Sequence, residues 1–151
     1  MEWPQPWDEF QELAKADMRK VYSETVVDHA TNPRNVGSME DASGFARIIG
    51  PCGDTMEIWL RVGDNTIVEA TFMTDGCGTT IAAGSMATEL ARGKSVIQAQ
   101  KISQQDVLKA LGGLPEESQH CALLVSNTLN EAVKDYLAFK NEPWKRAYRR
   151  H

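Results

Sequence analysis

Three cysteines stand at points where the chain is expected to change direction, and they are the residues best suited to chemistry. Glycine flanks Cys52 on one side and Cys77 on both sides, whereas Cys121 directly follows His120. Glycine allows unusual backbone angles and lets another group approach closely. A cysteine that merely fills a core seldom needs this freedom, so the three positions indicate thiol or metal chemistry.

The expected surroundings of these cysteines favour the thiolate form. Cys77 precedes a predicted helix and Cys121 lies in the first turn of another, where free N–H groups and the helix dipole stabilise a thiolate. Thiolates bind soft metals and attack sulfur. With Asp54 and His120 close by in the sequence, the three cysteines suit zinc, or iron bridged by sulfide.

The alternative for any single cysteine is a structural role, because free cysteine often behaves as a small buried hydrophobe. Cys121 alone, on the apolar side of a helix, would fit that role. Three cysteines in glycine-rich or helix-start positions make the functional interpretation the stronger one. His29, in contrast, is expected to be structural rather than a metal ligand.

Composition narrows the class of protein. The chain has 151 residues, 42% of them hydrophobic, and a formal charge of -5. This length suits one globular domain, and the pI near 5.2 argues against a nucleic-acid module. No apolar run is long enough to span a membrane, and the acidic N-terminus lacks secretory and transit patterns. We therefore expect a cytoplasmic protein without a disulfide framework.

Hydrophobic periodicity predicts the elements that position the cysteines. Apolar residues at helical spacing from Trp7 to Val26 predict a first helix that ends before Asn32. Alternation then predicts strands over 45–49, 56–62 and 68–72, with Trp59 on the more polar face and Val68 beside Ala70 and Phe72. Short connections make these strands an antiparallel meander.

The second half of the chain is predicted to be helical. One helix runs from Thr79 to a stop at Gly93, and a second is capped by Ser103 with Asp106. The last helix is capped by Ser118 and has one apolar side from Cys121 to Tyr136. Strands followed by helices give an α+β class, a two-layer fold with a three-stranded antiparallel sheet covered by helices.

The motifs together resemble a known family. The matching segments are Tyr22-Ser23-Glu24, Asp28-His29, Asn32-Pro33-Arg34-Asn35-Val36-Gly37, Cys52-Gly53-Asp54, Gly76-Cys77-Gly78 and His120-Cys121. In this order and spacing they resemble the iron–sulfur cluster assembly scaffolds of the IscU type, equivalent to the N-terminal domain of NifU. We accordingly divide the chain into an N-terminal helical extension (1–20), an IscU/NifU-like scaffold domain (21–140) and a basic C-terminal tail (141–151).

The resemblance implies a function and a ligand set. Cys52, Cys77 and Cys121 would hold a transient [2Fe–2S] cluster, with His120 or Asp54 completing the coordination. Cys121 would accept persulfide sulfur from an IscS/NifS-like cysteine desulfurase, and Asp54 would keep the cluster labile for transfer to recipient apo-proteins. Such a protein is a scaffold and carrier rather than an enzyme. Zinc can occupy the same residues, and a homodimer is compatible with the pattern.

Two departures from the family pattern bear on this expectation. The chaperone-binding LPPVK segment is replaced here by Leu114-Pro115-Glu116-Glu117-Ser118, which argues against dependence on an Hsp70-type chaperone. After Cys77, Gly78-Thr79-Thr80-Ile81-Ala82 varies the family's CGSAIA by small polar changes that we expect to leave the chemistry intact.

Two alternative functions use the same residues. The first is a zinc-bound persulfide acceptor or regulator of a cysteine desulfurase. The second is a Cys–His–Asp thiol hydrolase in which Cys121 or Cys77 is the nucleophile and a histidine its base. The hydrolase explains only one cysteine, and adjacent residues of a helix project about 100° apart, which would turn His120 away from Cys121.

Overall fold

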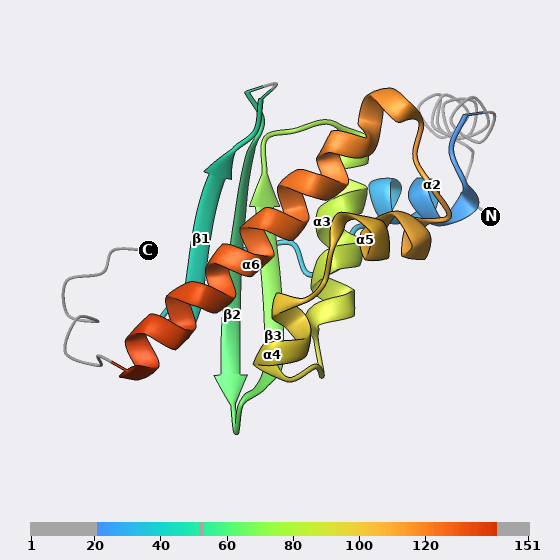
Figure 1. The fold of residues 1–151 in the computed structure, drawn as a ribbon. Coiled ribbons are helices and arrows are strands. Elements are labelled where there is room, and N and C mark those ends of the chain that lie inside the picture. Colours follow the sequence, from blue (N-terminus) through green and yellow to red (C-terminus); the bar gives the residue numbers. More distant parts are fainter. Residues whose placement is uncertain (1–20, 52, 142–151) are drawn as a thin grey trace, which may run out of the picture.

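A three-stranded antiparallel sheet forms one layer of the fold in the computed structural model, which describes residues 21–51 and 53–141 (Figure 1). The strand order is β1 (Gly44–Ile49), β2 (Thr55–Gly63) and β3 (Thr66–Thr74). Phe45 pairs with Trp59, and Ile58 pairs with Phe72. The predicted α+β class, meander and strand positions are therefore confirmed.

Helices form the second layer. The long α6 (Gln119–Asn141) lies across β1 and β2, and α3 (Gly78–Ala91) packs on β3 (Figure 1). Three shorter helices pack against these two: α2 (Glu24–Thr31), α4 (Val96–Gln100) and α5 (Gln104–Leu111). A single 3-10 turn, η1 (Glu116–Ser118), leads into α6. Within the described residues, no helix is long and apolar enough to cross a membrane.

The main core lies between the two layers. It includes Met56, Ile58 and Leu60 from β2 together with Leu129 and Val133 from α6, all fully buried. The predicted apolar side of α6 is confirmed, since its residues from Cys121 to Ala132 on that side are buried.

Two strand residues differ from their predicted environments. Trp59 is buried in a second cluster on the other face of the sheet, where its ring lies 5.2 Å from that of Phe45. Val68 is 53% exposed, because the β2–β3 register shifts at Arg61/Val62 and Ile67 takes the core position instead. A bulge of this kind cannot be read from strict alternation, since one extra residue reverses the faces beyond it.

The helix boundaries also correct the prediction in part. Helix α2 begins only at Glu24, where the Ser23 hydroxyl accepts a hydrogen bond from Val26 N, so the periodicity did not continue as one helix through Val21. The part of the predicted first helix before residue 21, the extension (1–20) and residues 142–151 of the tail lie outside the described residues. Helix α4, with its Ser95 capping box, was not predicted; the Ser103–Asp106 capping box of α5 was.

Helix α3 is buried on several sides because its residues are small. Its buried positions are Thr79, Thr80, Ala82, Ala83, Gly84, Ser85, Ala87, Thr88 and Ala91. A Cβ atom at Gly84 would lie 2.6 Å from the Phe72 ring, so glycine sets how closely α3 approaches β3. The predicted face of Ile81, Met86 and Leu90 is half-buried against the same core.

Replacement of Gly84 by alanine is expected to destabilise the fold. Although alanine favours a helix, its methyl group would collide with Phe72, and overpacking costs about 1–3 kcal/mol. Gly78→Ala is the matched control in the same helix, because a Cβ there meets only Ala30 at an ordinary 3.7 Å. Urea unfolding should show a loss of stability for Gly84→Ala alone; equal stability of the two variants would contradict this packing.

Candidate metal and thiol site

Three chain connections meet at one end of the two layers. They are the β1–β2 turn, the β3–α3 junction and the start of α6, all at the upper end of Figure 1. A Cβ atom at Gly50 would lie 3.2 Å from Leu124, which places the β1–β2 turn against the first turns of α6. Of the residues singled out by sequence, Asp54, Cys77, His120 and Cys121 lie on these connections.

The β1–β2 turn is held by its own backbone and by the end of β3. Gly50 N donates to Asp54 O at 2.7 Å, and Gly53, at φ +90, donates to Gly50 O. The Asp75 carboxylate accepts a hydrogen bond from Thr55 N at 2.7 Å. These contacts place Asp54 beside the β3–α3 junction.

Cys77 is the N-cap residue of α3, as its sequence position predicted. Its side chain is exposed and lies 3.1 Å from the Thr79 hydroxyl. Hydrogen bonding by the Thr79 hydroxyl is the main cause that lowers the pKa of Cys77 below its usual value. Burial opposes this shift, while the N–H groups of Thr80 and Thr79 add to it. Cys77 is thus an accessible thiol biased toward thiolate.

Cys121 lies in the first turn of α6 and is only 3% exposed. The His120 imidazole reaches it, with Nε2 3.7 Å from the sulfur. The expectation that helical geometry would turn His120 away from Cys121 was therefore wrong. The side chains of consecutive residues diverge at the backbone, but an imidazole is long enough to fold back over its neighbour.

Two threonine hydroxyls join these groups, and they are the residues that sequence reasoning undervalued. Thr79 Oγ1 lies 3.1 Å from Cys77 Sγ and 3.5 Å from Cys121 Sγ. Thr80 Oγ1 lies 3.3 Å from Cys121 Sγ and donates to Asp54 Oδ2 at 3.3 Å. Cys77, Cys121, Asp54 and His120 thus form one contiguous polar cluster, and the departure from CGSAIA lies at its centre.

The described residues hold only part of the predicted ligand set. Cys52 lies outside them, although its neighbours Pro51 and Gly53 belong to the β1–β2 connection. Among residues 21–51 and 53–141, no three His, Cys, Asp or Glu side chains are grouped closely enough to hold a metal ion. The thiol, imidazole and carboxylate groups present are nevertheless donors that zinc and iron accept.

The motif residues ahead of the first strand support α3 instead of joining the cluster. His29 is 8% exposed, and its Nδ1 lies 2.7 Å from the Ser85 hydroxyl. Burial is the main cause that lowers the pKa of His29. Arg34 N donates to the same Ser85 hydroxyl, and the Asn35 side chain donates to Thr88. This segment therefore fixes the helix that carries Cys77, as expected for a structural histidine.

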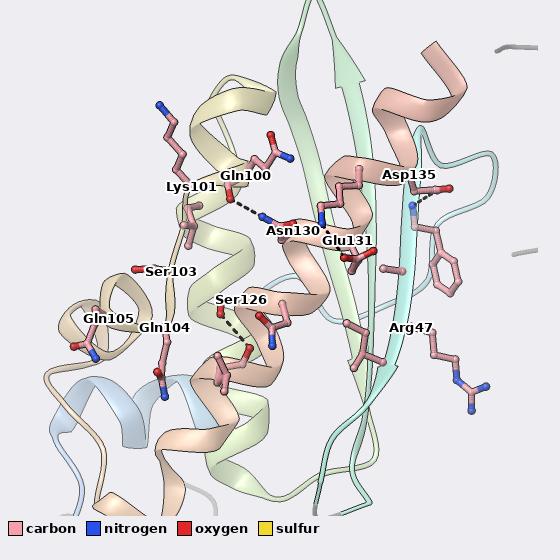
Figure 2. A pocket seen from close by; sticks show the side chains of 17 residues that line it. Arg47, Gln100, Lys101, Ser103, Gln104, Gln105, Ser126, Asn130, Glu131 and Asp135 are labelled. Carbon is pink, nitrogen blue, oxygen red and sulfur yellow. Dashed lines mark hydrogen bonds and ion pairs between the residues drawn. The ribbon is translucent and has the colours of Figure 1, made fainter. Parts of the chain in front are cut away.

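A wide groove of about 1300 Å³ lies elsewhere, between β1, α6 and the α4–α5 connection (Figure 2). Asn130 donates to Gln100 O across its floor, and Asp135 accepts from Phe45 N at its β1 side. The described residues that line it include no cysteine or histidine. The groove therefore does not belong to the thiol cluster.

Comparison with known proteins gives a consistent match. The sequence profile described as the NifU-like N-terminal domain matches residues 21–143. The iron–sulfur cluster assembly scaffold protein IscU 1 of Archaeoglobus fulgidus is 48% identical over 117 residues, covering 77% of this chain and 76% of that protein. A Drosophila melanogaster protein named iron–sulfur cluster assembly enzyme IscU is 41% identical over 121 residues, which cover 77% of this chain and 78% of that protein.

Solved structures agree with the fold. A NifU-like N-terminal protein from Brucella abortus superposes with a TM-score of 0.63 at 16% identity, covering 80% of this chain and 97% of that one. A protein described as an iron–sulfur cluster assembly scaffold for the SUF system of Fervidobacterium islandicum superposes with a TM-score of 0.61 at 21% identity. The match covers 76% of this chain and 98% of that one. At these identities the likeness concerns the fold alone.

Loss of the Thr79 hydroxyl is expected to raise the pKa of Cys77. In a Cys52→Ser/Cys121→Ser background, iodoacetamide should alkylate Cys77 with a pH midpoint below the value of about 8.5 for free cysteine. Thr79→Val should move that midpoint upward, since the hydroxyl is the main cause of the lowered pKa. Thr128→Val, at a buried threonine bonded to Leu124 O, is the control. An unchanged midpoint in Thr79→Val would refute the assignment.

Proposed function

The chain belongs to the NifU-like N-terminal domain family, and we propose that it is the scaffold on which a [2Fe–2S] cluster is assembled from iron and desulfurase-derived sulfur and then passed to recipient apo-proteins. Iron–sulfur cluster assembly is the function that its relatives are named for. The iron and sulfide are cargo in this proposal, so the protein acts as a carrier without catalytic turnover.

The observation that carries the proposal is the meeting of Cys77 and Cys121, which come from different helices, around the same Thr79 hydroxyl. Two thiols brought together with an imidazole and a carboxylate offer soft ligands beside harder ones. In the proposal Cys52 supplies the third thiolate, and His120 or Asp54 completes the set. The lowered pKa of Cys77 favours the thiolate that iron requires.

Asp54 is proposed to keep the cluster exchangeable. A carboxylate oxygen is a hard ligand and binds iron of a cluster less firmly than a thiolate does. Because Asp54 lies beside the Thr80–Cys121 pair, it can compete for a metal position without holding it tightly. A scaffold needs such a position, since it must release what it assembles.

Cys121 is proposed as the persulfide acceptor. Its thiolate would attack the outer sulfur of the desulfurase persulfide, forming a new S–S bond while the desulfurase cysteine leaves as thiolate. The transferred sulfur becomes sulfide only on two-electron reduction, for which a thiol reductant suffices. Cys121 is 3% exposed, so the start of α6 or the two threonines must shift before the sulfurs meet.

The other proposed properties follow from sequence. We propose a cytoplasmic protein that works with an IscS/NifS-like desulfurase and does not depend on an Hsp70-type chaperone. The segment that replaces LPPVK forms the turn η1, in which Glu116 and Glu117 are exposed. Zinc binding at the same residues remains the competing function, because Cys77, Cys121 and His120 are also donors that zinc accepts.

Replacement of Asp54 by alanine is expected to slow cluster transfer. Loss of an exchangeable carboxylate should leave a more inert cluster and reduce the transfer rate to an apo-ferredoxin by about tenfold. Asp75→Asn is not a suitable control because Asp75 holds Thr55; Asp64→Asn, in the β2–β3 turn, is a better one. A variant cluster that transfers as fast as the wild-type cluster would contradict this role.

Single cysteine replacements separate the ligand and acceptor roles. Cys52→Ser, Cys77→Ser and Cys121→Ser should each sharply reduce cluster absorbance, because a weak or absent ligand cannot hold the iron. Mass spectrometry after incubation with the desulfurase and cysteine should show a persulfide on wild type and on Cys77→Ser, but not on Cys121→Ser. Full cluster assembly by Cys52→Ser would show that Cys52 is not a ligand. A persulfide on the Cys121→Ser protein would refute the assignment of Cys121 as acceptor and would favour the exposed Cys77.

A further inference from the structure

We propose that Thr80 is a positioning residue whose hydroxyl holds the Asp54 carboxylate beside Cys121, and that this contact sets how readily the cluster leaves. The inference rests on the proposed scaffold function and adds to it a residue whose difference from the family pattern we expected to leave the chemistry intact. Thr80 stands at the fourth position of the CGSAIA pattern, where the pattern has alanine. The hydroxyl is therefore a departure of this chain from the pattern.

The contacts of Thr80 place it at the centre of the polar cluster formed by Cys77, Cys121, Asp54 and His120. Its side chain is fully buried, and its hydroxyl donates to Asp54 Oδ2 at 3.3 Å. The same oxygen lies 3.3 Å from Cys121 Sγ and 3.9 Å from Cys77 Sγ. A hydroxyl has one hydrogen and two lone pairs, so it can donate to the carboxylate and still accept from the Cys121 thiol.

Gly76 makes this arrangement possible. A Cβ atom there would lie 2.7 Å from Thr80 Cβ and 2.9 Å from Asp54 Oδ2. Both distances are shorter than nonbonded atoms allow, so a side chain at residue 76 would force Thr80 or Asp54 to shift and would disturb their contact. The glycine ahead of Cys77 is thus explained by the contact between two side chains on either side of it, and not by a left-handed backbone angle.

The consequence concerns the carboxylate as a metal ligand. While Oδ2 accepts the Thr80 hydrogen bond, it has less electron density to offer a metal ion, and the carboxylate cannot swing freely away from Cys121. The first effect keeps Asp54 a weak ligand, and the second keeps it close to the position of the iron–sulfur cluster. Groups that orient a ligand in this way typically change metal-site properties by 10–100-fold when they are replaced.

The test compares variants that remove or keep the hydroxyl. Thr80→Val removes it at nearly constant volume, Thr80→Ala removes it with a smaller side chain, and Thr80→Ser keeps it. Thr128→Val, at a fully buried threonine of α6 whose hydroxyl donates only to Leu124 O, controls for loss of a buried hydroxyl away from the thiols. Transfer of a preassembled cluster to apo-ferredoxin is timed for each variant, and for Asp54→Ala alone and combined with Thr80→Val.

We expect Thr80→Val and Thr80→Ala to slow transfer by about tenfold, whereas Thr80→Ser and Thr128→Val transfer at the wild-type rate. Thr80→Val should add nothing to Asp54→Ala, because both act through the same carboxylate. Wild-type transfer by Thr80→Val, slow transfer by Thr80→Ser, or a further slowing in the double variant would each overturn the proposal.

A second measurement on the metal-free protein is independent of the cluster. The carboxyl ¹³C resonance of Asp54, identified by its absence in Asp54→Ala, should shift in Thr80→Val and Thr80→Ala but not in Thr80→Ser. An unshifted resonance would overturn the proposal whatever the cluster does. If wild-type protein assembles no cluster, the scaffold function fails, and with it this role of Thr80, even where the resonance shifts.

Discussion

The close approach of the β3–α3 junction to Asp54 is the constraint on which the site depends. At Gly76 the absence of a Cβ atom lets Thr80 and Asp54 come within hydrogen-bond distance, and the first turn of α3 then brings Thr79 and Thr80 against Cys121. Cys77 and Cys121 are thus joined through the hydroxyl groups of one helix turn. Thiols held together in this way are close to one another, and they can still move apart to admit iron and sulfide.

The rest of the fold serves to hold α3 in place. Small residues along α3 let it lie between β3, α2 and α6, and Gly84 sets its distance from Phe72. The loop through Arg34 and Asn35 fastens the outer side of the helix by hydrogen bonds to Ser85 and Thr88. Motif residues far from the cysteines therefore support the site mechanically, since any shift of α3 would move Cys77.

Most of the architecture could be predicted from sequence because it rests on local patterns. Alternation located the strands, capping residues located α5, and the glycines drew attention to Cys77. The bulge that exposes Val68 and the burial of Trp59 could not be predicted, because they depend on pairing and on a second cluster. The roles of Thr79 and Thr80 were missed since hydroxyls at a helix start ordinarily indicate only solubility or capping. Only three-dimensional proximity to Cys121 and Asp54 reveals them.

In the proposed function the three cysteines assemble iron and sulfide and do not merely store zinc. This function is tested most directly by anaerobic incubation of the protein with ferrous iron, cysteine, a cysteine desulfurase and dithiothreitol, followed by analysis of bound iron, sulfide and zinc. A scaffold should then hold iron and sulfide in equal amounts and show visible charge-transfer bands. A colourless protein that holds about one zinc ion per chain, as a mononuclear site would, would contradict it.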